Sequence, residues 1–324
     1  MTDDNNGIIR VEGEDMPERN SGDFDSQKLI DDFIADTQNL KDESKKGYRK
    51  SLKKYFNWVK KSGFNIQKIT LTEILVYKKY LEDSRKKDGE KLSDFTIGTY
   101  LIAVKIFYEW ANGKGLYLIN PAKSLKSPKK ESRYERKPLD PEQIQELFDY
   151  FKGKSIRDYA IITTLYYCAL RTIELVRLDF GDIQMVKNNR VIWVQGKGKT
   201  KKDRRVPLFD KAALPITEYL KTRENLTKDS PVFVSESIMK PGGRLVTGTI
   251  SHIVKEGLRA IGIDSKEYTA HSIRHSSATN AIRGGASEVQ VQKMLRHVDI
   301  KTTKIYKRTI EEEDDLNNAA GEFL

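Results

Sequence analysis

The chain has 324 residues, of which 38% are hydrophobic, enough for one or two domains with apolar cores. With Cys168 as its one cysteine, the chain cannot form an intramolecular disulfide. It also contains no run of about eighteen apolar residues, the length that a membrane span requires. The formal net charge is +11, but residues 1–26 and 307–324 are acidic, whereas residues 27–306 carry 54 basic and 33 acidic side chains. Such a basic body indicates a polyanionic partner such as nucleic acid, with a solvated basic surface as the alternative.

The first 25 residues are polar, acidic and rich in Gly, Asn and Asp. This composition cannot bury a core, so we predict a disordered acidic N-terminus over residues 1–25. The segment MTDDNNG has neither the basic start nor the apolar run of a signal peptide. A cytoplasmic, nucleoid-associated protein is therefore expected.

Residues 26–122 show helical periodicity and few strand signals, which predicts a compact helical bundle. A plausible cap at Ser44 and a stop at Gly63 bound one helix, and Thr72 opens another. Many helical bundles have this pattern, so it does not specify a function. The expected helices start near Gln27, Ser44, Thr72 and Phe95, and a short fifth piece begins at 119–121.

Residues 123–137 hold seven bases and two acids without apolar periodicity, which predicts a domain linker. The linker is either a solvated tether or a segment that contacts nucleic-acid phosphates while it passes around a duplex. Lys129, Lys130 and Arg133 are its candidate contacts.

The region 138–306 predicts a mainly α, α+β domain in which a small antiparallel sheet lies on a helical body. Asp140 followed by Pro141 is a strong helix start. Further helices are expected over 155–167, 211–222 and 247–261, and strands over 183–185, 191–193 and 205–208. Cys168 is expected to be a buried small side chain within an apolar run.

The last part of this region, residues 271–306, places His271, Arg274, His297 and Tyr306 on three short linked elements. His271 and Arg274 are three residues apart, so they share one face of a helix that Thr269 caps. Ser287 and Gln290 form a predicted capping box for the next helix, which would carry His297. Tyr306 follows in a threonine-rich segment.

The order of these motifs resembles that of the tyrosine recombinases. HSIRH, LRH and TTKIY are similar to the family's second signature box, and ALRTIEL, with Arg171 and Glu174, to its first. The segment GKGKTKKDRRVPL supplies the hairpin lysine, Lys197. In this chain Arg296 and Ala169 replace glycines that are usual in the family, and Ile173 replaces a serine. The resemblance covers residues 138–310, and the helical bundle resembles the family's core-binding domain.

The resemblance implies cleavage and rejoining of DNA through a 3′-phosphotyrosyl intermediate. Such chemistry needs a nucleophile, donors that neutralise the transition state, a base and an acid. Tyr306 would attack, and the planar forks of Arg171 and Arg274 would bind the non-bridging oxygens. Remaining roles are implied for Lys197 as the acid, His271 as the proton acceptor, His297 as a phosphate hydrogen-bond partner and Glu174 as a supporting residue.

No cofactor or metal is expected. His271 and His275 have the spacing of a zinc-binding helix, but residue 272 is Ser where a Glu would be required. The six bases in Lys197–Arg205 are too dense for solubility alone. We therefore expect DNA-backbone contacts from Lys199, Lys201, Lys202, Arg204 and Arg205.

The expected partners are double-stranded DNA with paired inverted half-sites, three further copies of the chain in a tetramer that acts through a Holliday junction, and accessory or directionality proteins. Residues 307–324 form a tail with an apolar stripe that could dock on a neighbouring protomer or remain disordered. Two other functions stay open: a type IB-like topoisomerase, which relaxes supercoils as a monomer, and a DNA-binding protein with a decayed site. Xer-like and mobile-element roles both fit the sequence.

Overall fold

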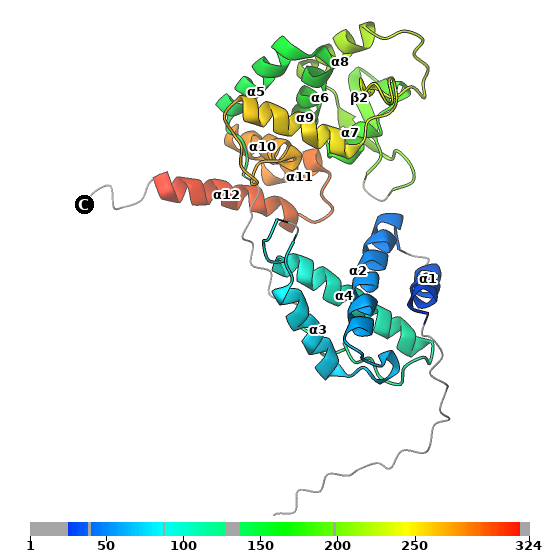
Figure 1. The fold of residues 1–324 in the computed structure, drawn as a ribbon. Helices are drawn as coiled ribbons and strands as arrows, with labels where there is room; N and C mark the ends of the chain where they lie inside the picture. Colours follow the sequence, from blue (N-terminus) through cyan, green and yellow to red (C-terminus); the bar gives the residue numbers. More distant parts are fainter. Residues whose placement is uncertain (1–24, 38–39, 87, 127–136, 197–198, 318–324) are drawn as a thin grey trace, which may run out of the picture. The chain divides into compact units, whose positions relative to one another are not determined.

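The computed structural model describes residues 25–37, 40–86, 88–126, 137–196 and 199–317. The chain divides into two compact units, residues 1–131 and 132–324, each described by itself (Figure 1). The predicted disordered N-terminus up to residue 24, most of the predicted linker and the tail after residue 317 lie outside the described residues. The same holds for Lys197, Lys129, Lys130 and Arg133.

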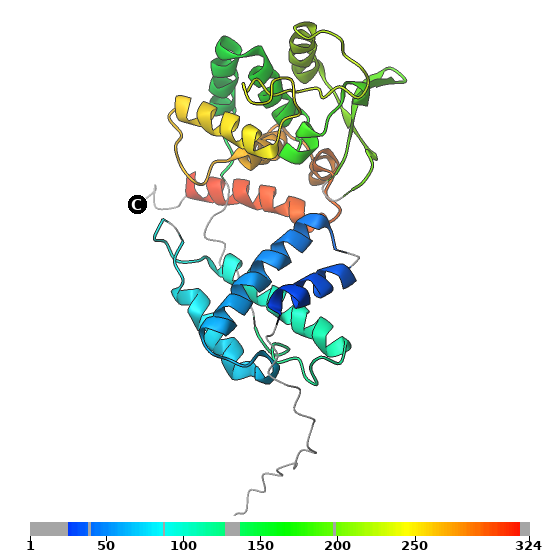
Figure 2. The same cartoon turned by 45° about the vertical axis from the view of Figure 1, so that its right-hand side comes forward.

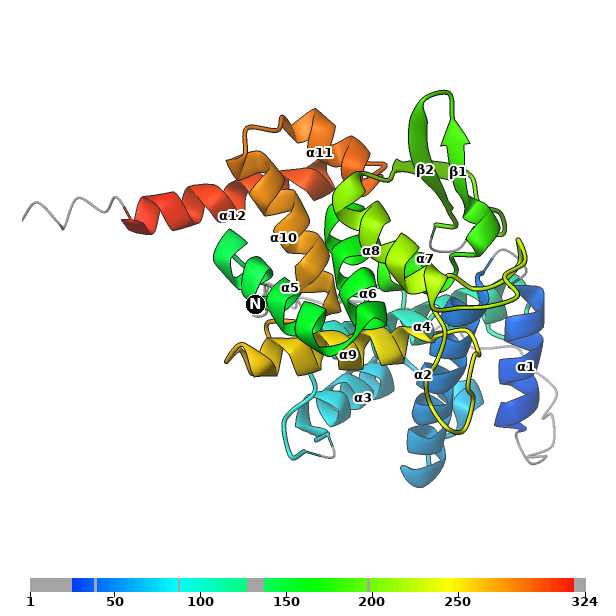
Figure 3. The same cartoon turned by 90° about the horizontal axis from the view of Figure 1, so that it is seen from above.

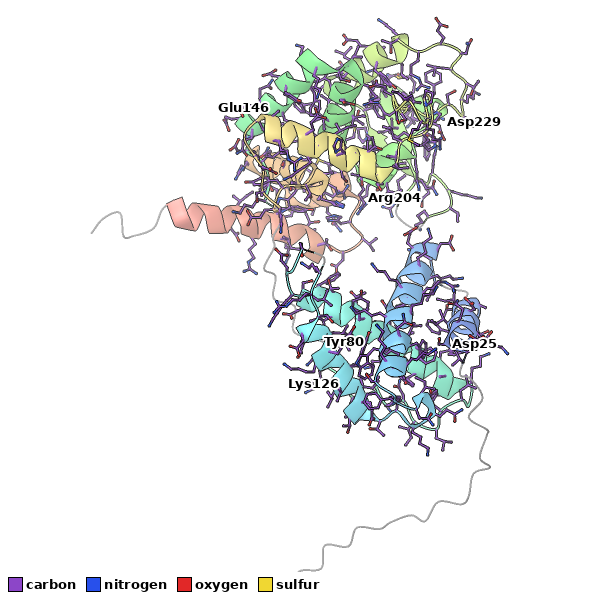
Figure 4. All side chains as sticks on the ribbon, viewed as in Figure 1. Asp25, Tyr80, Lys126, Glu146, Arg204 and Asp229 are labelled. Atoms are coloured by element: carbon purple, nitrogen blue, oxygen red, sulfur yellow. The ribbon has the colours of Figure 1, made fainter. Side chains whose placement is uncertain are left out.

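Unit 1 is a helical bundle, as its periodicity predicts. Asp25, labelled in Figure 4, accepts from the backbone of the first helical turn. A capping box of Thr70 and Glu73 starts the third helix. The predicted fifth piece is a turn, because the Asn120 side chain accepts from the Ala122 amide at 2.8 Å, a bond that closes a turn. The α-helices described here are α1 (Ser26–Asp36), α2 (Asp42–Lys61), α3 (Leu71–Asp83) and α4 (Asp94–Gly113).

Aromatic side chains dominate the core of unit 1. Tyr55 and Tyr108 are fully buried, and their hydroxyl groups lie 2.7 Å apart in a hydrogen bond. The ring of Tyr55 also packs edge-on against that of Tyr77, at 4.9 Å between centroids. Large rings of this kind bury much apolar area, and the hydroxyl pair satisfies polar atoms that water cannot reach.

Unit 2 is built around one central helix. That helix, α10 (Ala270–Arg283), packs against α6 on one side and against α11 and α12 on another (Figures 1 and 3). The helix α9 (Thr247–Ala260) packs against α5, α7 and α10 (Figure 2). The remaining helices are α5 (Pro141–Lys154), α6 (Ile156–Tyr167), α7 (Thr172–Val176), α8 (Asp210–Lys221), α11 (Glu288–Leu295) and α12 (Lys301–Asn317).

Local signals set several of these helix boundaries. Asp140 accepts from the Gln143 amide at 2.7 Å, and Pro141 is the first residue of α5, as predicted. The predicted cap at Thr269 and capping box of Ser287 with Gln290 are both present. Cys168 is 1% exposed, which confirms its predicted burial.

The predicted antiparallel sheet is present, with three strands in the order β1-β2-β3. The strands are β1 (Ile183–Val186), β2 (Asn189–Val194) and β3 (Arg204–Pro207). Trp193 lies opposite Arg205, whose guanidinium stands 5.6 Å from the ring centroid. Strands β2 and β3 form the hairpin that carries the basic segment, and Arg204, labelled in Figure 4, begins β3.

Two predicted elements near the C-terminus differ from the structure. The helix α11 ends at Leu295, because Arg296 adopts a left-handed conformation with φ of 56°, so His297 lies beyond the helix and not on it. Tyr306 belongs to α12, a helix of 17 residues that packs against α10 and α11, and not to a short segment. The positive φ ends α11 and redirects the chain, which allows a long helix to follow.

Candidate active site

The carboxylate of Glu174 lies at the centre of the candidate site. Arg171 precedes α7, and Glu174 reaches back to accept from the Arg171 amide at 2.9 Å and from its guanidinium at 2.8 Å. The Glu174 side chain is 1% exposed, whereas that of Arg171 is 28% exposed. Burial would raise the pKa of Glu174, but the charges of the surrounding arginines, above all Arg296, bring it below its usual value. Glu174 is therefore an anionic support that orients Arg171.

Arg274 enters the same site from α10. Its guanidinium donates to the carbonyl oxygens of Ala169 and Leu295 and lies 4.0 Å from the Glu174 carboxylate. Burial, together with the neighbouring arginine charges, lowers the pKa of Arg274 to about 9, so the group stays charged at neutral pH. These bonds join the segment before α7 to the end of α11.

His297 and Tyr306 complete the cluster. The His297 Nδ1 lies 3.1 Å from the Thr303 hydroxyl, and its ring stacks on that of Tyr306 with 6.2 Å between centroids. Burial raises the pKa of Tyr306, and the charges of Arg274 and Arg171 partly offset this effect. The charges of these two arginines therefore favour ionisation of the phenol.

The charges of this cluster suit a phosphate group. Arg171, Arg274 and Arg296 surround one carboxylate, which leaves two positive charges in a largely buried site. A phosphodiester carries one negative charge, and its pentavalent transition state concentrates more on the non-bridging oxygens. Fixed cations in a water-poor site stabilise such charge strongly.

Two further predicted catalytic residues are His271 and Lys197. His271 lies on α10 three residues before Arg274, with an exposed side chain, and its amide donates to the Thr269 hydroxyl at 3.3 Å. Lys197 falls outside the described residues. The roles of both residues remain predictions.

Among the predicted DNA contacts, Lys201, Arg204 and Arg205 have exposed side chains, and Lys199 is also exposed and lies 3.9 Å from Asp203. Lys202 differs from them. Its ammonium binds Asp179 at 2.5 Å and also binds Asp182, and its side chain is 23% exposed. The Asp179 carboxylate is shared with Arg244, which also donates to the Val176 carbonyl at 3.0 Å. Lys202 thereby ties the hairpin to the segment after α7.

A comparison of two adjacent lysines tests this distinction. Replacing Lys201 by Ala should reduce the slope of log affinity against log salt by ~0.9, because one phosphate contact is lost, with little change in stability. Replacing Lys202 by Ala should instead lower the free energy of unfolding by ~1–3 kcal/mol, because the partly buried Asp182 loses this cation and Asp179 keeps only Arg244. DNA titration at several salt concentrations and urea unfolding measure both quantities. Equal stability of the two variants would contradict the tethering role.

The His297 environment predicts a pH dependence of stability. Burial, followed by the charges of Arg274, Arg171 and Arg296, lowers the pKa of His297 to about 4, against ~6.5 in an unfolded chain. The unfolded state therefore binds the proton first, and the contribution of neutral His297 is present above pH 6.5 and is lost as pH falls toward 4. Lowering the pH from 7.5 to 5.5 should cost about 1 kcal/mol of stability that a His297→Gln variant does not lose. Urea unfolding of both proteins at the two pH values measures this; identical pH dependence would contradict it.

Sequence reasoning missed two residues of the cluster. Arg296 binds the Glu174 carboxylate at 2.8 Å with a side chain that is 7% exposed. His275 packs its ring edge-on against Tyr306, at 4.7 Å between centroids. The replacement of a usual glycine was the only sequence signal for Arg296. The spacing of His275 from His271 was considered as a zinc-binding pattern and rejected, because residue 272 is Ser. Within the described ranges, no group of three or more His, Cys, Asp or Glu side chains could hold a metal ion.

Hydrophobic length gives a further finding. No helix in the part of the chain that the structure describes is long and apolar enough to cross a bilayer.

Comparison with known proteins places the chain in a family. Residues 137–313 match the phage integrase family, and residues 30–115 match the phage integrase N-terminal SAM-like domain. Tyrosine recombinase XerC of Pelobacter propionicus is 32% identical over 221 residues, which are 67% of this chain and 70% of that protein. A tyrosine recombinase of Thermosipho africanus is 29% identical over 292 residues, covering 88% of this chain and 95% of the relative.

Solved structures share the fold. The recombinase XerH bound to a palindromic difH substrate superposes with a TM-score of 0.71 at 19% identity, covering 92% of this chain and 85% of that one. The Tn1549 transposon integrase with circular intermediate DNA gives a TM-score of 0.66 at 21% identity, covering 87% and 94%. With its mainly helical body, its small antiparallel sheet and both family matches, the chain belongs to the phage integrase family and is a tyrosine recombinase.

Proposed function

We propose that this protein is a site-specific DNA recombinase that cleaves and rejoins DNA through a 3′-phosphotyrosyl intermediate on Tyr306. One observation carries the proposal: the guanidinium groups of Arg171 and Arg274 meet at Glu174, and the ring of Tyr306 packs against a small core that includes Ala169 and Leu295. The carbonyl groups of these two core residues bind Arg274. A nucleophile and two fixed cations at one point are what phosphoryl transfer requires.

In the proposed reaction the Tyr306 oxygen attacks the scissile phosphorus. A bond forms between this oxygen and phosphorus, and the bond from phosphorus to the 5′-oxygen breaks. The phenol proton passes to a base, for which His271 remains the predicted acceptor. Lys197 is the predicted donor of the proton that the leaving 5′-oxygen takes up. Because a phenolate is also a good leaving group, the 5′-hydroxyl can later attack the phosphotyrosine and restore the DNA without ATP.

Unit 1 contains a surface that would suit DNA binding. Lys54 lies 5.6 Å from the ring centroid of Tyr80 and 5.3 Å from that of Tyr100, and Tyr80 is labelled in Figure 4. Ammonium groups bind phosphates, and exposed aromatic rings pack on sugars and bases. Lys54 and Tyr80 border an open hollow of about 530 Å³, which is lined by Lys54, Asn57, Trp58, Lys61, Ser62 and Tyr80.

Recovery of covalently bound DNA tests the proposed function. The protein is incubated with a library of random duplexes that carry a nick near the cleavage point, denatured, and separated from free DNA. Sequencing of the attached strands should give one preferred site joined through its 3′ end to Tyr306. If wild-type protein never forms a covalent complex, it is a DNA-binding protein with a decayed site. If it relaxes supercoiled DNA without a paired target, the topoisomerase alternative is favoured.

We further propose that four copies assemble on paired inverted half-sites and exchange strands through a Holliday junction. The helix α12 continues beyond Tyr306 to Asn317, so the nucleophile and residues 307–317 of the tail lie on one helix. A tail that docks on a neighbouring protomer could therefore move Tyr306 directly. The palindromic substrate named for the XerH structure is consistent with paired half-sites.

Truncation of the chain before Glu311 tests the role of the tail. The truncated protein should bind a single half-site normally, because the deleted residues are acidic and DNA repels them. It should assemble poorly on paired sites and cleave the two sites independently. Native gels and recombination assays on the same two-site DNA compare it with the full chain. Unchanged tetramer formation and recombination would exclude this coupling role.

A further inference from the structure

Arg296 connects two separate turns at the candidate site. One terminal guanidinium nitrogen of Arg296 donates to the carbonyl of Met294 at 2.8 Å and to that of Cys168 at 3.3 Å. The other terminal nitrogen donates to the Ala169 carbonyl and to the Glu174 carboxylate, each at 2.8 Å. The side chain thus joins the end of α11 to the segment that leads into α7, although these segments are more than 100 residues apart in the chain.

Both joined turns have an unusual backbone. Ala169 has φ of 45° and Arg296 has φ of 56°, in the left-handed region that favours glycine. These are the two positions where the family resemblance leads one to expect glycine. The Ala169 carbonyl also accepts from Arg274, so the two guanidinium groups share one acceptor. Both replaced positions therefore involve the same carbonyl group: Ala169 carries it, and the side chain of Arg296 donates to it.

The position of Arg296 bears on each catalytic group. Arg171 follows the bound turn at Ala169, and His297 follows Arg296 itself. Glu174 receives Arg171 on one oxygen and Arg296 on the other. A shift of this carboxylate would therefore move Arg171, whereas a shift of the Ala169 carbonyl would release Arg274.

We propose that Arg296 is a positioning residue for strand cleavage: by bridging the two turns it holds Arg171, Arg274 and His297 in register around the scissile phosphate. The inference rests on the proposed recombinase function and deepens it. In this scheme Arg296 does not bind the phosphate through its terminal nitrogens, because protein acceptors occupy both of them. Its Nε is buried and has no hydrogen-bond partner among the described residues.

Substitution of Arg296 by glycine tests the role of the guanidinium group separately from that of the backbone conformation. Arg296→Gly removes the bridge but favours the left-handed φ, so the turn after α11 can keep its course. Arg296→Lys keeps a positive charge but loses the planar fork that serves several acceptors. Lys187→Gly is the matched control, because Lys187 has φ of 53° on an exposed turn between β1 and β2.

The experiment measures single-turnover cleavage at saturating concentrations of the duplex recovered by covalent trapping. Arg296→Gly should cleave ~10–100-fold more slowly than wild type, the usual effect of losing a group that orients a reactive one. Its dissociation constant for that duplex should stay within about threefold, because Arg296 makes no proposed DNA contact. Arg296→Lys should remain ~10-fold slow. Lys187→Gly should cleave at the wild-type rate.

A neutral substrate distinguishes positioning from a general loss of structure. A methylphosphonate at the scissile position has a methyl group in place of one non-bridging oxygen and is therefore neutral, so its cleavage depends less on aligned arginines. The defect of Arg296→Gly should shrink to within about threefold on this substrate, since charge neutralisation is what misaligned donors fail to supply. An equal defect on both substrates overturns the positioning role.

The positioning role is also overturned if Arg296→Gly and Arg296→Lys both cleave the natural phosphodiester at the wild-type rate. That result would leave the proposed function intact. Should the glycine variant fail to fold by circular dichroism, the lysine variant decides by the same two substrates. If wild-type protein forms no covalent complex with any duplex, the proposed function itself fails, and the role of Arg296 fails with it.

Discussion

Tyr306→Phe is expected to abolish covalent complex formation while leaving the affinity for DNA within about twofold, because one hydroxyl is lost from a large charged interface. The structure adds a reason for the intact fold. The Tyr306 ring packs against His275 and His297, and phenylalanine keeps both ring contacts. The variant should therefore bind, bend and assemble on DNA like the wild type but stop before cleavage.

The measurement is the fraction of nicked duplex that becomes linked to protein after denaturation. Tyr150→Phe provides a matched control, since it also removes one tyrosine hydroxyl from unit 2. That hydroxyl donates to the Glu256 carboxylate at 3.0 Å. This control should trap DNA as the wild type does. Detection of a covalent complex with Tyr306→Phe would show that another residue is the nucleophile.

The second large effect concerns the two arginines, whose surroundings predict different outcomes. Arg171→Ala should slow cleavage by ~10²-fold or more, as expected for loss of a preorganised donor. Its side chain is 28% exposed, and among the described residues its guanidinium bonds to Glu174, so the loss of stability should be modest. Lysine should restore little activity at this position, because an ammonium group cannot make the planar, two-pronged contact.

Arg274→Ala should slow cleavage to a similar extent and also destabilise the fold by ~2–4 kcal/mol. Its side chain is 6% exposed, and its removal leaves the buried Leu295 carbonyl without this donor. Arg283→Ala, on the exposed side of α10, controls for the loss of one charge and should change neither quantity. Single-turnover cleavage and urea unfolding give the two measurements. Normal cleavage by either arginine variant would remove that arginine from the proposed site.

The sequence predicted most elements because their signals are local. Helix starts at Asp140, Thr269 and Ser287 depend on side chains that bond within their own first turn. The strands of the sheet were recognisable because alternating apolar residues flank turn residues. The piece near Asn120 was misjudged because an Asn side chain can close a turn as readily as it can cap a helix.

The candidate site was predictable to the extent that its residues belong to ordered motifs. Arg171, Arg274 and Tyr306 were singled out by their order and spacing, and the structure brings them into one neighbourhood. His297 was expected on a helix, but no local rule places an arginine in a left-handed conformation before it. Lys202 was expected at the DNA, but aspartates 20 and 23 residues earlier in the chain bind its ammonium.

By itself, then, the sequence determined which groups the protein has for phosphoryl transfer, where its helices begin, and which family it belongs to. Only the tertiary structure decided how those groups are held. Arg296 could be recognised as part of the site only after folding brought the Ala169 turn and Glu174 against the end of α11. The physical reason is that a buried guanidinium must find acceptors to offset its desolvation, and here they come from chain segments that the sequence keeps far apart.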